Sequence, residues 1–177
     1  MSGLQLALDA PGVTSSGQGE AYWFFGHLAV VRSPEGARPI VIEHHVGPDS
    51  GPPLHVHPHL EDSFYLVSGQ LAVRCGDDSF LASEGDYVAL PAGVPHAFRV
   101  VSDEEAVLLQ THARTDFLDF IRRGGVPADQ RRPETSELDF TALHELAAET
   151  GQPVLGPPLS PEDAAAILAA ARPGRRS

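Results

Sequence analysis

The sequence predicts an all-β fold, a small barrel or sandwich, followed by α-helices. Between positions 21 and 114, short stretches rich in aromatic and β-branched residues alternate with turns that contain Gly or Pro. After that region the pattern changes, and apolar residues recur at helical spacing. The 177 residues suffice for one domain with a hydrophobic core but not for two comfortable ones. We therefore expect a β-barrel over 21–114 and a C-terminal helical extension over 115–171.

The two ends and the helical extension have recognisable local signals. Residues 1–20 are interpreted as an N-terminal arm, and the tail RPGRRS (172–177) as disordered. Helix signals are seen over 116–123, over 136–150, and from Ser160, where a Ser-Pro pair and two acids open an Ala-rich run. The segments between these helices, 127–133 and 155–158, read as a polar linker and a Pro-rich loop.

Composition limits the partners of the chain. Lys and Arg total 12 against 24 Asp and Glu, a net charge of −12. Nucleic acid and anionic membranes attract basic surfaces, so neither is expected as the main partner. The single cysteine, Cys75, allows no intramolecular disulfide, which fits a reducing compartment. With no secretory signal or long apolar run in view, a cytoplasmic location is expected.

One stretch, GPPLHVHPHLEDSFYLVSG over 51–69, carries most of the chemistry. His55, His57 and His59 alternate, and the adjacent carboxylates Glu61 and Asp62 follow at once. Alternate residues of an extended strand share a face, so His55 and His57 can aim at one point. Imidazole and carboxylate ligands together suit a divalent transition metal such as Fe, Ni, Mn, Co, Cu or Zn. The stretch therefore predicts most of a metal site at the mouth of the barrel.

A second stretch supplies the remaining ligand. In GDYVALPAGVPH over 85–96, Pro91 and Gly93 form a tight turn, and His96 opens the next strand. If that strand lies beside the first stretch, His96 meets His55 and His57. We predict these three histidines as metal ligands.

The spacing of these residues resembles the cupin superfamily. Its first motif, G-x5-H-x-H-x3,4-E-x6-G, is matched at His55, His57 and Gly69, whereas Gly51 lies only four positions before His55. Its second motif, G-x5-P-x-G-x2-H-x3-N, is matched at Gly85, Pro91, Gly93 and His96, with Val100 in place of the asparagine. The resemblance implies a double-stranded β-helix, the cupin jelly-roll barrel, in a single-domain member.

The carboxylate of the first motif has two candidates. Counting back from Gly69 gives Asp62, whereas counting forward from His57 gives either Glu61 or Asp62. Strand parity places Asp62 on the inward face with Phe64, which favours Asp62. Because Asp is one methylene shorter than Glu, it either ligates the metal or falls short and moves protons. Asp62 and Glu61 are thus the catalytic candidates, and Asp62 joins the histidines as the fourth predicted ligand.

The substrate pocket is expected inside the barrel. One of His44 and His45 should face inward, and the sequence alone does not decide which. Inward-facing aromatic and apolar residues would line a barrel that holds one small ligand. The predicted lining set consists of Trp23, Phe25, His45, Phe64, Leu66, Phe98 and Gln110.

The function implied by the resemblance is a metal-dependent enzyme. The runs GEAYWFFGHLAVV, GVPHAFRV and ETGQPVLGPPL look like bacterial single-domain cupins described as similar to quercetin 2,3-dioxygenases. This implies a dioxygenase-like oxidoreductase acting on a small phenolic or enol-containing molecule. The alternatives are a non-oxidative cyclase, isomerase or decarboxylase, and a non-enzymatic small-molecule binder. Cupins are commonly dimers, and a homodimer is expected here.

Overall fold

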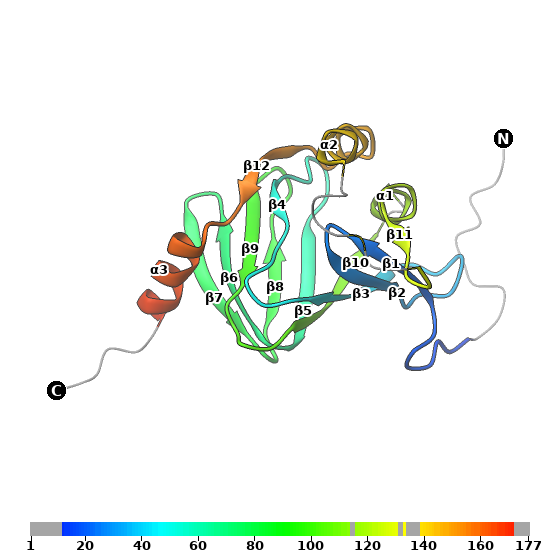
Figure 1. Cartoon of the computed structure of the whole chain (residues 1–177), viewed down its shortest axis with the longest axis horizontal. Coiled ribbons are helices and arrows are strands. Elements are labelled where there is room, and N and C mark those ends of the chain that lie inside the picture. The colour runs from blue at the N-terminus through cyan, green and yellow to red at the C-terminus, as the bar shows by residue number, and fades with distance from the viewer. Residues whose placement is uncertain (1–11, 114–115, 131–132, 134–138, 172–177) are drawn as a thin grey trace.

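The computed structural model describes residues 12–113, 116–130, 133 and 139–171. Two antiparallel sheets face each other, as Figure 1 shows. The expected disordered tail and most of the expected N-terminal arm lie outside the described residues. The seven-stranded sheet has the order β11 (Val126–Pro127), β1 (Glu20–Phe24), β2 (His27–Val31), β3 (Ile40–Val46), β10 (Ala106–His112), β5 (Asp62–Ser68), β8 (Tyr87–Leu90). The five-stranded sheet has the order β12 (Val154–Pro158), β4 (Pro53–His55), β9 (His96–Val100), β6 (Gln70–Cys75), β7 (Asp78–Ser83).

The strands bury alternate residues against the opposite sheet. On β3 and β10, buried and half-buried side chains alternate along all seven positions. That period of two is what a sheet with one covered face requires. The main core cluster lies between the sheets and includes Leu66, Leu71, Val73 and Val100, each fully buried. The predicted all-β fold is confirmed.

A two-residue turn joins β1 to β2 and places an aromatic ring. Phe25 and Gly26 have φ angles of 47° and 82°, and Phe24 pairs with His27 across the turn. Positive φ at both central positions is the turn geometry that suits the twist of a hairpin. Glycine adopts it freely, whereas a phenylalanine in this region costs about 1–3 kcal/mol. The ring of Phe25 packs edge-on against Phe24 and Phe120.

In the described part of the chain, three helices cover the sandwich from outside. Helix α1 (Asp116–Gly124) packs against β1 and against α2 (Phe140–Glu149), and α3 (Pro161–Ala171) covers β6 and β7. Asp139 caps α2, and Ser160 caps α3 by accepting from the amide of Asp163. The helix expected from residue 136 begins at Phe140; 136–138 lie outside the described residues. Among the described residues, the structure contains no helix with the length and apolar character of a membrane span.

The C-terminal extension contains two short strands in its described part, in addition to helices. It contributes β11, which pairs with β1, and β12, which pairs with β4. β11 includes only the first residue of the expected linker, whereas β12 contains the whole of the expected Pro-rich loop, and each forms an edge strand of its sheet. Proline at an edge is tolerated because its missing N–H can face away from the ladder, and the register of β12 shifts twice along its length. In Figure 1, β12 bridges α2 and α3 along the rim of the sandwich.

Candidate metal centre

Four residues converge where the ends of three strands meet. His55 ends β4 and is paired in register with His96, the first residue of β9. His57 lies in the loop after β4, where its carbonyl accepts from the amide of Gly93 at 2.9 Å. Gly93 has a φ of 76°, so the tight turn before His96 needs this glycine. Asp62 opens β5 in the other sheet. The local turns and strand pairing therefore bring both sequence stretches to one place.

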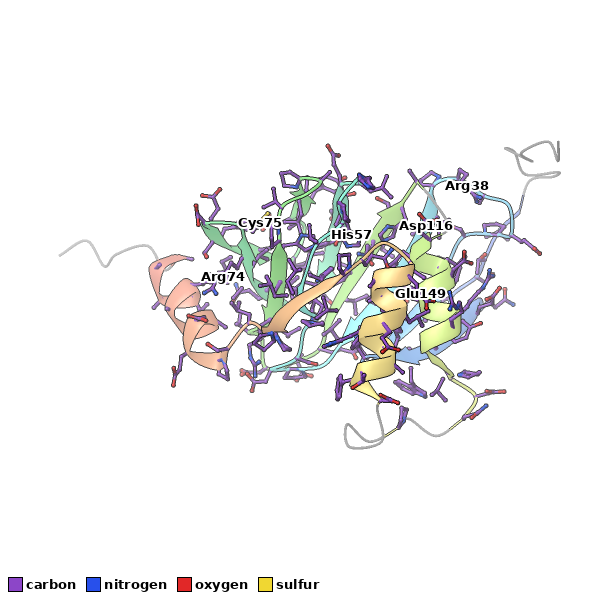
Figure 2. All side chains as sticks on the ribbon, turned by 90° about the horizontal axis from the view of Figure 1, so that it is seen from above. Arg38, His57, Arg74, Cys75, Asp116 and Glu149 are labelled. Atoms are coloured by element: carbon purple, nitrogen blue, oxygen red, sulfur yellow. The ribbon has the colours of Figure 1, made fainter. Side chains whose placement is uncertain are left out.

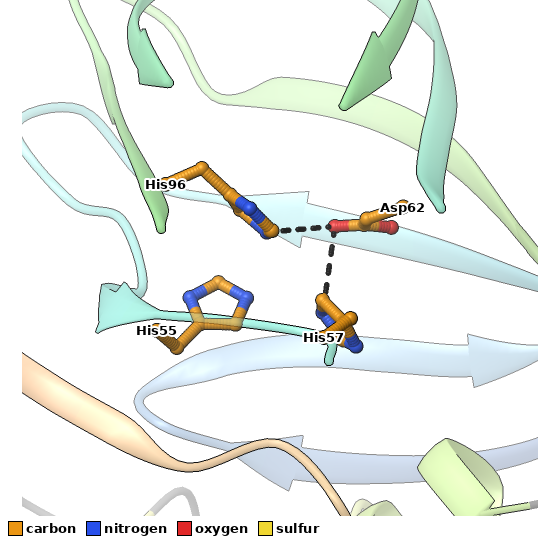
Figure 3. A group of neighbouring side chains, drawn as sticks. All are labelled: His55, His57, Asp62 and His96. Carbon is orange, nitrogen blue, oxygen red and sulfur yellow. Dashed lines mark ion pairs between the residues drawn. The ribbon is translucent and has the colours of Figure 1, made fainter. Parts of the chain in front are cut away.

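The four side chains point toward a common centre, as Figure 3 shows. One ligand-type atom from each of His55, His57, Asp62 and His96 lies within 4.8 Å of all the others. Asp62 Oδ2 lies 3.5 Å from His96 Nε2 and 3.8 Å from His57 Nε2. This arrangement can hold one metal ion between three imidazoles and a carboxylate.

The histidine rings are oriented with a ring nitrogen free for a ligand. His55 Nδ1 donates to the carbonyl of Pro53 at 2.8 Å, and His96 Nδ1 donates to that of Val94 at 2.9 Å. A carbonyl only accepts, so each Nδ1 carries the proton and each Nε2 keeps its lone pair. The Nε2 atoms of His57 and His96 are buried without a hydrogen-bond partner among the described residues. A bound metal would satisfy these costly orphaned atoms, so the residues fit a metal.

The electrostatics keep these groups in their ligand forms. Burial lowers the pKa of His55 to about 4 and that of His57 to about 3, so both rings are neutral at pH 7. Burial alone would raise the pKa of Asp62. The close contact with His96, the other neighbouring histidines and the hydrogen bond from Gln110 outweigh burial and hold the pKa of Asp62 well below its usual range. Neutral imidazoles and an ionised carboxylate are what metal binding requires.

Glu61, the alternative carboxylate, does not join this group. It is exposed and precedes β5, whereas Asp62 is 4% exposed and faces inward. Strand parity explains the difference, because consecutive residues entering a strand point to opposite faces. His59 is likewise exposed and stands outside the group.

A narrow apolar cavity of about 70 Å³ adjoins the centre. His55 and Asp62 contribute to its wall, together with residues of both sheets and of α1. In Figure 2, His57 lies in the interior, between the strands and the two helices that carry Asp116 and Glu149. The cavity is lined by Phe24, Phe25, His27, His44, Val46, Pro52, Pro53, His55, Asp62, Phe64, Phe98, Leu108, Gln110, Phe117, Phe120, Gln152 and Val154.

Of the predicted pocket residues, Phe25, Phe64, Phe98 and Gln110 line this cavity. His45 does not, and the prediction is corrected. Its ring faces away from the core and contacts Glu43 at 2.9 Å and Glu105 at 3.2 Å. The inward residue is His44, which follows the buried Ile40 and Ile42 at a spacing of two. That parity was the signal that would have selected it.

Two further pocket predictions are corrected. Trp23 neighbours the inward Phe24 on β1, so alternation turns it away, and its indole N–H donates to the carbonyl of Gln130 at 3.2 Å. Leu66 faces inward but lies deeper than Phe64 on β5, and it is fully buried in the apolar core rather than on the cavity. Position along a strand, and not parity alone, therefore decides which inward residues reach a cavity.

Sequence reasoning missed the part of the wall that comes from distant segments. Phe117 and Phe120 of α1 pack in the core cluster beside β1, and both also line the cavity. Gln152 follows α2; its Nε2 donates to the carbonyl of Thr150 at 2.7 Å, which leaves Oε1 buried without a partner in the described part of the chain. No local sequence motif predicts such contacts, because they depend on how α1 and the segment after α2 pack against the sheets.

Comparisons with known proteins agree with the fold and the motifs. Residues 42–112 match the family model described as a cupin domain, Cupin_2. The chain is 31% identical over 120 residues to the quercetin 2,3-dioxygenase of Bacillus subtilis (strain 168), an alignment that covers 66% of this chain and 32% of that protein.

Solved structures show the same fold. KdgF from a Halomonas species superposes with a TM-score of 0.54 at 14% identity, covering 62% of this chain and 99% of that one. An RmlC-like cupin from Shewanella frigidimarina gives a TM-score of 0.51 at 17% identity, covering 61% and 96%.

Residues 42–112 therefore match the cupin domain model, and the sheets around them have the fold of the solved cupin structures. That segment contains the four residues of the candidate metal centre as well as His44 and Gln110. The chain spans about a third of the length of the quercetin 2,3-dioxygenase that it matches. Four phenylalanines of the cavity wall lie outside the segment matched by the domain model, namely Phe24, Phe25, Phe117 and Phe120.

Proposed function

We propose that this chain is a metal-dependent enzyme acting on a small organic molecule with a phenolic or enol oxygen, with dioxygenase chemistry of the quercetinase kind. The observation that carries the proposal is the set of three imidazoles and one carboxylate, with orphaned Nε2 atoms, beside an apolar aromatic cavity. The resemblance to a quercetin 2,3-dioxygenase over two thirds of the chain supports the reaction class.

A divalent transition metal, held by His55, His57, His96 and Asp62, would act as a Lewis acid and lower the pKa of a bound hydroxyl group. Its identity is left open among Fe, Ni, Mn, Co, Cu and Zn. The residues of this chain have separate tasks. The phenylalanines of the cavity would bind a flat apolar ring by edge and face contacts and exclude water. Asp62 can accept a proton from the substrate oxygen when its carboxylate is not fully engaged as a ligand.

The size of the cavity restricts the substrate. Its volume of about 70 Å³ is well below the roughly 300–1,000 Å³ of sites for drug-sized ligands. A three-ring phenol would therefore require the phenylalanine side chains to move, whereas a molecule with one small ring needs less rearrangement. We expect tighter binding of single-ring phenols and small enols than of flavonols.

Metal analysis combined with turnover under air and under argon tests the proposal. The purified chain should contain about one transition metal per molecule, and product from a phenol or enol panel should form only with oxygen present. Product without oxygen would instead support the non-oxidative cyclase, isomerase or decarboxylase. Saturable binding with no turnover would support a binder. Absence of metal after reconstitution with each candidate ion would overturn the metal centre.

Two further expectations belong to this proposal. The homodimer stays a prediction, which gel filtration would test. Phe120 and Ile121 of α1 are buried within the chain, against β1 and α2. The cytoplasmic location also stays a prediction, which localisation of the tagged chain would test.

A further inference from the structure

A chain of three hydrogen bonds leads away from the carboxylate of Asp62. Gln110 Nε2 lies 2.7 Å from Asp62 Oδ1, and His44 Nε2 lies 2.8 Å from Gln110 Oε1. His27 Nε2 then lies 3.1 Å from His44 Nδ1. The four residues belong to β5, β10, β3 and β2, which are consecutive neighbours in the seven-stranded sheet. The chain therefore crosses the inner face of the sheet one strand at a time.

The direction of each bond follows from the one before it. An ionised carboxylate only accepts, so Gln110 must turn its NH₂ group to Asp62 and its carbonyl oxygen to His44. His44 must then carry its proton on Nε2, which leaves a lone pair on Nδ1. That lone pair requires His27 to donate from Nε2. Every donor in this series of hydrogen bonds thus points toward Asp62. If the amide of Gln110 were flipped, its oxygen would face the carboxylate of Asp62, and both atoms are acceptors.

The surroundings of His44 agree with this assignment. The residue is 4% exposed, and burial lowers its pKa to about 4, so at pH 7 it holds one proton and one lone pair. Gln110 is 7% exposed, so its amide is largely shielded from bulk water. Buried polar groups with paired donors and acceptors are rigid, because a change at one costs a bond at the next.

We propose that Gln110, His44 and His27 are positioning residues that fix the rotation of the Asp62 carboxylate, so that Oδ2 faces His57 and His96. This role rests on the proposed metal centre, because a fixed Oδ2 matters there as a ligand or as a base. The series of hydrogen bonds orients the carboxylate of Asp62 and does not conduct protons away from it. The amide of Gln110 could pass a proton only by becoming an imidic acid, a high-energy tautomer.

The first test uses the metal-free protein at pH 7, labelled with ¹⁵N-histidine. We expect NMR to show His44 as the neutral tautomer protonated at Nε2, and expect Gln110→Leu to remove that fixed tautomer. A His44 ring protonated at Nδ1, or charged at this pH, would overturn the assigned direction. Neither result depends on whether the chain binds a metal or has activity.

The second test is titration with Co²⁺, followed by its visible absorption spectrum. Gln110→Leu and His44→Phe should weaken Co²⁺ binding by about 10- to 100-fold and alter the spectrum, as the loss of groups that orient ligands does elsewhere. His44→Gln places an amide donor near the position of Nε2 and should restore most of the affinity. His45→Gln, the outward neighbour on β3, is the matched control, and thermal unfolding verifies that each variant folds.

The outcomes distinguish the positioning role of Gln110, His44 and His27 from the proposed metal centre. If Gln110→Leu is folded and binds Co²⁺ with wild-type affinity and spectrum, the positioning role is wrong while the metal centre stands. A wild-type chain that binds no Co²⁺ would overturn both. Equal losses in His44→Phe and His44→Gln would also contradict the role, because only the phenylalanine removes the donor.

Discussion

The space between the two sheets has two ends of opposite character. At one end, His57, Asp62 and His96 are buried with their polar atoms facing each other. At the other end, Leu66 and Leu71 are fully buried among apolar neighbours. Strand β5 passes through both, from Asp62 through Phe64 to Leu66. The same strand geometry therefore serves both ends, and only the side chains on its inner face differ.

The difference has an energetic meaning. Buried apolar side chains stabilise the fold, each by roughly 1.5–3 kcal/mol when fully buried. Buried nitrogen atoms that have no hydrogen-bond partner among the described residues reduce the stability of the metal-free fold, because they lose their bonds to water. We infer that the burial of apolar side chains at one end offsets the loss of stability caused by the buried polar groups at the other end.

The largest expected effect comes from removing a ligand at the polar end. His96→Ala should reduce bound transition metal, measured by elemental analysis, from about one ion per chain to a small fraction of that value. His59→Ala is the matched control, because this histidine lies in the same loop as His57 but is exposed. Equal metal contents in the two variants would contradict the division between a ligand and a surface histidine.

A cavity at the apolar end should affect stability and leave the site intact. Leu66→Ala removes a fully buried side chain and should lower the free energy of unfolding by about 2–5 kcal/mol, measured by denaturant titration. Metal content should stay at the wild-type value. Loss of metal from a variant that is still folded would show that the two ends are coupled.

A smaller effect should separate the adjacent histidines His44 and His45. Because the pKa of buried His44 is lowered to about 4, the unfolded chain binds a proton that the folded chain does not as the pH falls below about 6.5. The free energy of unfolding of the metal-free protein should therefore decrease between pH 6.5 and about 4, by up to about 3 kcal/mol from this residue. His44→Gln should make that decrease shallower.

The control for this pH dependence is His45→Gln. Burial lowers the pKa of His45, but hydrogen bonds with Glu43 and Glu105 outweigh burial and raise it. Well below pH 6.5 its ring is thus charged in both states, and its replacement should shift the curve with little change in its slope between pH 4 and about 5.5. A slope that responds to His45 and not to His44 would reverse the assignment of inward and outward residues.

Much of the site could be predicted from the sequence because it depends on local rules. Alternation, the Pro91 to Gly93 turn and the position of Asp62 at a strand start are short-range features, and the structure brings together the four residues they indicate. The choice of His45 was wrong although the same rule applied. The alternation of Ile40 and Ile42 continues to His44, and that longer run carried the information.

The remaining wall of the cavity could not be predicted in this way. Phe117 shares the cavity with Phe24 only because α1 packs on β1, more than 90 positions away in the chain. β11 and β12 likewise form because an open sheet edge was available for pairing, and their own sequences are short and rich in proline. Such contacts follow from the tertiary fold, so periodicity within a segment does not reveal them.

The order of these parts along the chain has a consequence for synthesis in the cell. A ribosome releases the N-terminus first, so every residue of the metal centre has emerged once His96 and the strands after it are free. The phenylalanines of α1 and the β12 strand emerge only afterwards. For a short interval the nascent barrel would present its histidines to the surrounding solution without the part of the aromatic wall that α1 supplies.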